Sequence, residues 1–74
     1  MKKYNNFCMA WIENDKKNET CFFCKASAIR EYIRLLYAHM DENRDISSLT
    51  IYGVTVRDFR LEDITSNINR FLAN

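Results

Sequence analysis

The N-terminal third of the chain consists of two apolar runs separated by a polar one. Residues 4–13 and 20–26 are rich in aromatic and other β-compatible side chains, whereas residues 14–18 are charged or turn-forming. This pattern predicts a β-hairpin in which Glu13 faces Glu19 across a loop formed by residues 14–18. That register pairs Cys8 with Cys24, Met9 with Phe23 and Trp11 with Cys21.

Both faces of the predicted hairpin are apolar. Because successive side chains of a strand point to opposite faces, one face carries mainly small residues and the other mainly large ones. Such a hairpin is either buried on both sides or left open on one side for a partner. The smaller face contains Cys8, Ala10, Ile12, Phe22 and Cys24, and the larger face contains Phe7, Met9, Trp11, Cys21 and Phe23.

The middle of the chain has the spacing of an amphipathic helix. Ser27 is a suitable N-cap, and six apolar residues follow at positions i, i+3, i+4, i+7, i+8 and i+11. The polar segment 41–45 ends the helix. We expect the helix to pack on the sheet through the part of this stripe that contains Ile29, Ile33, Leu36 and Met40.

The C-terminal part of the chain predicts one more strand and one more helix. Residues 49–56 are mostly β-branched or aromatic, with Gly53 at an expected bulge or bend. Asp58 is a suitable helix cap, and the residues after it form a second apolar stripe with helical spacing. This stripe consists of Leu61, Ile64, Ile68, Phe71 and Leu72.

Together these elements predict an α+β fold with a three-stranded antiparallel sheet and two helices, in the order β-β-α-β-α. A right-handed crossover through the first helix places the third strand beside the first, which leaves the first strand in the centre of the sheet. The chain has no Pro, a single Gly and no repeat, so the sequence gives no indication of a linker between domains. We therefore expect one domain over residues 1–74.

Composition narrows the functional classes. A hydrophobic content of 47% with 28% charged residues is typical of a packed globule. The net charge of +1 is unlike the basic balance of a general nucleic-acid binder and unlike the acidic balance of a DNA mimic. No apolar run reaches the roughly 20 residues of a membrane span, and residues 1–6 do not lead into a signal-peptide core. We predict a cytoplasmic protein, and the abundance of Lys, Asn, Ile, Phe and Tyr indicates AT-rich coding, as in many bacteria and their phages.

The three cysteines and the single histidine are the first candidates for chemistry. An odd number of cysteines argues against a disulfide framework, so we expect reduced thiols that pack as small apolar groups. A zinc site at the C-x-x-C is disfavoured, because residues three apart in a strand face opposite sides. A redox centre is disfavoured because the thioredoxin-type motif opens a helix, whereas this one ends a predicted strand. His39 is interpreted as a residue at the edge of the core rather than as a catalytic base. We therefore expect no metal, no cofactor and no enzymatic activity from Cys8, Cys21, Cys24 and His39.

Partner binding is the function that remains. Two short helices leave one hairpin face uncovered if both lie on the same side of the sheet, and large apolar side chains on an open face are typical of a protein interface. Trp11 is the expected anchor, because tryptophan is enriched at binding hot spots. The face either pairs with a second copy, which gives a homodimer, or is presented to a host or phage protein. Its residues are Phe7, Met9, Trp11 and Phe23.

Two functional hypotheses follow. The first is a small non-enzymatic binding module, most concretely a phage or mobile-element inhibitor of a host defence nuclease, comparable to anti-CRISPR proteins. The alternative is a small nucleic-acid-binding regulator with a basic patch, although nearby acidic residues neutralise much of its charge. That patch consists of Arg30, Arg34, Arg57 and Arg60.

Overall fold

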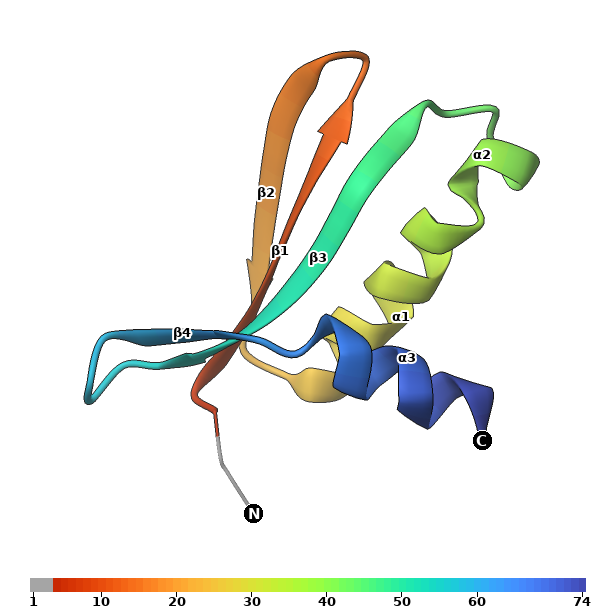
Figure 1. The fold of residues 1–74 in the computed structure, drawn as a ribbon. Helices are drawn as coiled ribbons and strands as arrows, with labels where there is room; N and C mark the ends of the chain where they lie inside the picture. The colour runs from red at the N-terminus through yellow and green to blue at the C-terminus, as the bar shows by residue number, and fades with distance from the viewer. Residues whose placement is uncertain (1–3) are drawn as a thin grey trace.

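The computed structural model describes residues 4–74, and residues 1–3 of the N-terminal segment discussed above lie outside the described residues. Over the described residues the chain forms one antiparallel sheet with the strand order β2-β1-β3-β4 (Figure 1). The elements are β1 Asn6–Glu13, β2 Lys16–Phe22, α1 Lys25–Leu36, α2 Ala38–Asp41, β3 Ile46–Thr55, β4 Arg60–Asp63 and α3 Thr65–Ala73.

The predicted fold of three strands and two helices is wrong, because residues 4–74 form four strands and three helices in the order β-β-α-α-β-β-α. The first strand does lie between the second and the third, as the crossover argument predicts. The additional strand is β4, which takes the start of the predicted second helix and pairs Leu61 with Val54. The additional helix is α2, which forms because the long predicted helix breaks at Tyr37.

The reason for β4 is the length of β3. This strand runs for ten residues and turns back at residues 56–59, so the returning chain satisfies the backbone groups on the outer edge of β3. The helix α3 consequently starts only at Thr65. Its N-cap is Ile64 and not the predicted Asp58, and the residue before the cap, Asp63, accepts a hydrogen bond at Oδ1 from the Thr65 amide at 2.9 Å.

The hairpin register also differs from the prediction. Asn14 and Asp15 both adopt positive φ, 51° and 65°, and form a two-residue turn that pairs Glu13 with Lys16. Asn and Asp tolerate this conformation better than other non-glycine residues, so the loop is shorter than the polar run suggests. As a result Cys8 faces Cys21 and not Cys24.

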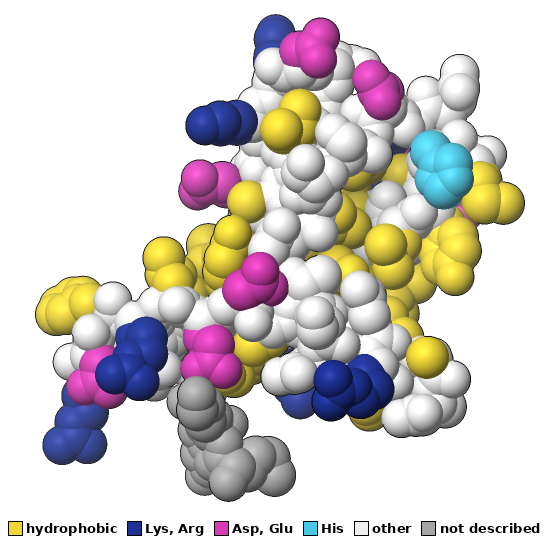
Figure 2. All heavy atoms as spheres, viewed as in Figure 1, with side chains coloured by type: hydrophobic (Ala, Val, Ile, Leu, Met, Phe, Trp, Pro, Cys, Tyr) yellow, Lys and Arg dark blue, Asp and Glu magenta, His cyan; other side chains and the backbone are white. Residues whose placement is uncertain are grey.

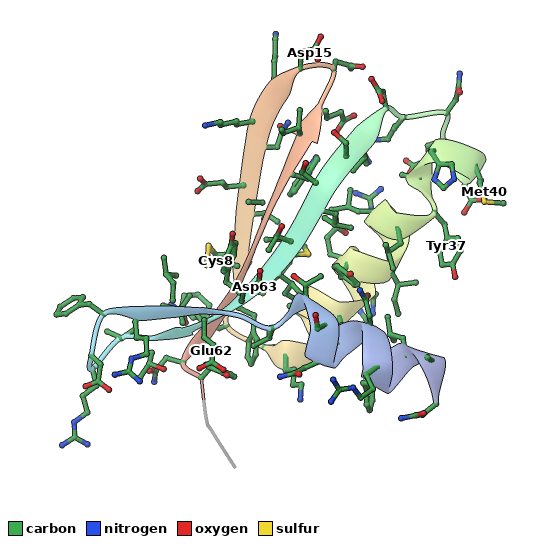
Figure 3. All side chains as sticks on the ribbon, in the orientation of Figure 1. Cys8, Asp15, Tyr37, Met40, Glu62 and Asp63 are labelled. Carbon is green, nitrogen blue, oxygen red and sulfur yellow. A yellow bond between two sulfur atoms is a disulfide. The ribbon has the colours of Figure 1, made fainter. Side chains whose placement is uncertain are left out.

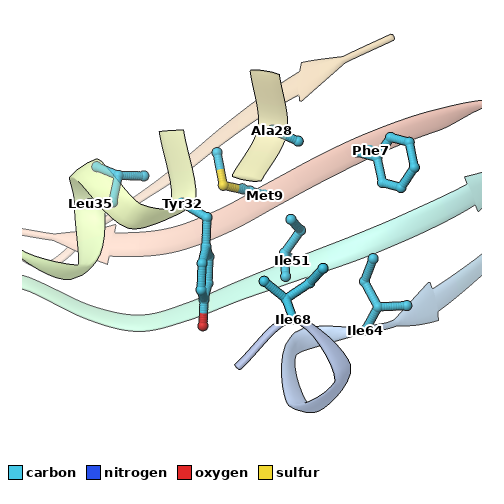
Figure 4. Close-up of a cluster of buried hydrophobic side chains, with 8 residues drawn as sticks. All are labelled: Phe7, Met9, Ala28, Tyr32, Leu35, Ile51, Ile64 and Ile68. Carbon is cyan, nitrogen blue, oxygen red and sulfur yellow. The ribbon is translucent and has the colours of Figure 1, made fainter. Parts of the chain in front are cut away.

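The core lies between the sheet and the helices, which all pack on the same face of the sheet (Figures 1 and 4). The helix α1 is most deeply buried at Ala28, Tyr32 and Leu35. Of the residues predicted to pack on the sheet, Ile29 and Leu36 contact the core only in part, and Ile33 and Met40 are exposed. The row 28, 32 and 35 lies one position from the row 29, 33 and 36, and one position corresponds to about 100° around the helix axis. The buried set is Phe7, Met9, Ala28, Tyr32, Leu35, Ile51, Ile64 and Ile68.

The opposite face of the sheet carries a disulfide bond between Cys8 and Cys21. The expectation of reduced, buried thiols is therefore wrong for these two residues, because the short turn places them directly opposite each other with their Cα atoms 4.0 Å apart. Cys24 keeps a free thiol and is exposed. No helix among residues 4–74 has both the length and the apolar character needed to cross a membrane.

The single glycine has a packing role. Gly53 pairs regularly with Phe7 and Glu62, whereas the bulge expected there lies instead between Ala10 and Ile12 on the neighbouring strand. A Cβ atom at Gly53 would lie 2.5 Å from the ring of Tyr4. The glycine therefore lets an aromatic ring lie directly on the backbone of β3.

Candidate partner-binding groove

An exposed apolar stripe runs along the outer side of α1 and α2. Ile33, Tyr37 and Met40 are 36%, 53% and 70% exposed, although they recur at the spacing of a buried helix face. Figure 3 shows the side chains of Tyr37 and Met40 pointing away from the sheet. Because α1 buries Ala28, Tyr32 and Leu35 fully and Ile29 and Leu36 in part, its apolar surface is wider than its contact with the core, and Ile33 is left exposed.

The helix α3 supplies the second wall of a groove beside this stripe. A depression of about 430 Å³ lies between α1 and α3, and hydrophobic side chains gather on this part of the surface (Figure 2). A second depression of about 330 Å³ shares Leu36 and Asn69 with the first and extends toward β3, so the two are contiguous. The first is lined by Ile33, Leu36, Tyr37, Asn69, Leu72 and Ala73.

Hydrogen bonds set the spacing between the two walls. The Tyr32 hydroxyl, which is buried, donates to Asn69 Oδ1 at 2.6 Å and ties α1 to α3. Burial raises the pKa of the Tyr32 hydroxyl, so it remains a donor at neutral pH. At the start of α3, the Ile51 amide donates to Thr65 Oγ1 at 3.0 Å, which anchors the helix on β3. The groove is therefore held open by fixed contacts with the core.

The residues predicted to form a partner surface on the hairpin do not lie together. Phe7 and Met9 are buried under the helices, because large side chains fill the space between sheet and helix better than the small side chains of the other face. Trp11 is half-buried, and its indole N–H donates to Glu13 Oε1 at 3.2 Å. Phe23 is 89% exposed in the connection between β2 and α1. On β1 the larger side chains are covered and the smaller ones lie on the open face. On β2 the changed register reverses the predicted faces, so that Cys21 lies on the open face and Phe22 packs against the core.

The predicted arginine patch is divided between two regions. Arg30 and Arg34 lie on α1, and the Arg34 guanidinium is held by Glu31 at 2.7 Å and by Glu42 at 3.1 Å. Arg57 and Arg60 lie in the β3–β4 hairpin, which projects away from the helices (Figure 1). The four residues therefore do not form one basic surface.

Cys24 is an exposed free thiol outside the groove. It precedes α1, and hydrogen bonds from the backbone amides of Ser27 and Ala26 lower the pKa of its thiol, because they stabilise the thiolate. His39 lies exposed on α2 beside the second depression. Among residues 4–74, no three His, Cys, Asp or Glu side chains are grouped closely enough to hold a metal ion.

Of the groove residues, Ile33, Leu36, Tyr37 and Leu72 belong to the two apolar stripes that the sequence predicts, whereas Asn69 and Ala73 do not. A signal was present: residues 28, 32 and 35 and residues 29, 33, 36 and 40 form two parallel apolar rows, wider than one sheet contact can bury. Comparison of the chain with protein-family models, with curated proteins and with solved structures finds no match.

Proposed function

We propose that the chain is a small protein-binding module whose α1–α3 groove receives an apolar segment of a partner protein. The observation that supports this is the exposed row Ile33, Tyr37 and Met40, which borders a depression of about 430 Å³. An exposed apolar patch beside a concavity is a common feature of protein interfaces, and its burial provides the main driving force for binding.

The lining of the groove favours a partner with one or two large apolar anchors. Ile33, Leu36 and Leu72 offer aliphatic walls with no charge, so a Leu or Phe side chain on an amphipathic helix fits this site. Tyr37 lies at the rim, where an aromatic ring buries a large area and its hydroxyl stays in water. The Arg34 ion pairs are already satisfied within the chain, so charge contributes less to recognition than apolar contact.

A host or phage protein is the proposed partner, and inhibition of a host defence nuclease is the narrowest form of the proposal. A cytoplasmic location belongs to the same proposal. The cytoplasm keeps most thiols reduced, whereas Cys8 and Cys21 form a disulfide in this structure. Fractionation of cells that carry the protein therefore tests the proposed location directly.

Two exposed double variants test the groove. Tyr37→Asp with Met40→Asp places two charges on the stripe, and Phe59→Asp with Leu61→Asp places two charges on exposed apolar residues of the β3–β4 hairpin. We expect the first variant to lose the partner and the second to retain it, because a charge buried at an apolar contact is costly. The measurement is capture of partner from nuclease-treated host lysate, followed by titration of the purified partner.

The circular dichroism melting curves of both variants provide the folding control, since none of the four side chains is buried. Equal loss of partner in both variants would contradict a specific groove. A partner released by nuclease treatment would instead favour the nucleic-acid alternative.

A further inference from the structure

The outer strand β2 has an unpaired edge. It is the last strand of the sheet on its side, with β1 as its neighbour, and Figure 1 shows it on the outer side of the hairpin. Hydrogen-bonded and non-hydrogen-bonded pairs alternate along an antiparallel ladder, and Glu13–Lys16 closes the turn as a hydrogen-bonded pair. Lys17, Glu19 and Cys21 therefore direct their N–H and C=O groups outward. The short Cα separation of Cys8 and Cys21, 4.0 Å, agrees with a non-hydrogen-bonded pair.

The same edge carries two opposite charges that have no ion-pair partner among residues 4–74. Lys17 and Glu19 are both exposed and, two residues apart in a strand, point to the same face. Neither makes an ion pair or a side-chain hydrogen bond with any residue of the described range 4–74. Pairing of this edge with another strand would place each charge beside a cross-strand neighbour.

A second copy of the chain is the partner whose charges match this edge. Two antiparallel β2 strands must bring their outward residues together, so the two-fold axis passes through one of residues 17–21, and an axis at residue 20 or 21 sets no opposite charge across from Lys17 or Glu19. An axis at Lys17 or at Glu19 sets that residue against its own copy, which places like charges opposite each other. An axis at Asn18 pairs Lys17 of each copy with Glu19 of the other, so both pairs attract.

We infer that β2 is a homodimer interface in which two copies pair antiparallel about Asn18. Each Lys17–Glu19 pair exchanges two backbone hydrogen bonds. The four-stranded sheets of the two copies thereby become one continuous sheet. The Cys8–Cys21 disulfide lies next to this edge and holds β2 on β1. Less conformational entropy is therefore lost when the edge pairs with a second copy. The interface is separate from the α1–α3 groove, and the proposed function does not depend on it.

Charge reversal tests the interface. Lys17→Glu alone and Glu19→Lys alone each replace both attractive pairs by like-charge pairs, whereas the double variant Lys17→Glu with Glu19→Lys restores them. We expect the dimer dissociation constant to rise at least about tenfold in each single variant and to return toward the wild-type value in the double variant. Added salt should weaken the wild-type dimer, because the pairs are exposed. The measurement is sedimentation equilibrium of the full chain.

A mixing experiment sharpens the result. The two single variants carry Glu-Glu and Lys-Lys at these positions, so an equimolar mixture should form a heterodimer that native mass spectrometry resolves. Melting curves of the single variants control for folding. A wild-type chain that stays monomeric at millimolar concentration, a dimer unaffected by either reversal, or failure of the swap to restore it would each overturn the inference. So would loss of the dimer in the Tyr37→Asp, Met40→Asp variant, which would place self-association in the groove.

Discussion

At the scale of single residues, the hydrogen-bond partners of Glu13 lower the pKa of its carboxyl group strongly. Its carboxylate accepts two hydrogen bonds from Arg44, at 2.7 and 2.9 Å, and one from the Trp11 indole. The hydrogen bonds from Arg44 and then Trp11 lower the pKa of Glu13 from 4.5 to about 2. Because Arg44 follows α2, this contact joins the end of β1 to the chain that enters β3.

This pKa shift predicts a pH-dependent part of the stability. A carboxyl group that is more acidic in the folded state stabilises it fully above its unfolded pKa, and the contribution is lost as the pH falls from about 4.5 toward 2. We expect Glu13→Gln to lose less stability than wild type over this range. Urea midpoints measured from pH 6 to pH 2 test this, with Asp58→Asn in the β3–β4 turn as the control substitution. Parallel curves for wild type and Glu13→Gln would contradict it.

At the scale of elements, the orientation of α1 predicts an asymmetric response to truncation. Leu35 is fully buried against the sheet, so Leu35→Ala should cost about 2 to 5 kcal/mol of the free energy of unfolding. Met40 lies in the predicted core stripe but is 70% exposed, and Met40→Ala should change stability by less than about 0.5 kcal/mol. Chemical denaturation of the two variants distinguishes the observed orientation of the helix from the one predicted from sequence. If the predicted stripe faced the sheet, Met40→Ala would strongly lower the free energy of unfolding.

The disulfide between β1 and β2 leads to a second prediction for the elements. The disulfide closes a loop with a sequence separation of 13, and a loop of about 15 residues corresponds to about 3 kcal/mol of lost chain entropy in the unfolded state. We expect the double variant Cys8→Ala, Cys21→Ala to be destabilised by about 2 to 4 kcal/mol. Denaturation is measured in the Cys24→Ser background, so that thiol exchange does not interfere. A reducing agent should lower the stability of the Cys24→Ser parent and leave the double variant unchanged; an effect on both would argue against this disulfide.

At the scale of the whole molecule, the sheet has one face covered by helices and one face open. The helices cover Phe7, Met9 and Ile51, and the open face carries the disulfide, Ala10 and Thr50. The groove between α1 and α3 and the edge of β2 lie on different parts of this framework (Figure 1). The proposed partner groove and the proposed dimer edge therefore do not overlap, and each of the two surfaces can be tested by variants that leave the other intact.

The sequence by itself determined the elements that depend on local interactions. The hairpin, the main helix and the long third strand follow from apolar spacing and turn residues, and the central position of β1 follows from the handedness of the crossover. The C-terminal helix was also expected, although its first turns became β4, because the apolar spacing of Leu61 and Ile64 fits a helix as well as a strand that ends in a turn.

Only the tertiary structure decided which surfaces are open. A one-position choice on α1, between Tyr32 and Ile33, selects the row that faces the sheet, and it depends on packing against Met9, Ile51 and Ile68 rather than on spacing. The length of the turn at Asn14 and Asp15 fixes the register, and with it the disulfide and the charges on the edge of β2. The choice on α1 is made by contacts between residues far apart in the chain, which local patterns do not contain, whereas the register follows from the backbone conformation of the two turn residues, which the length of the polar run does not specify.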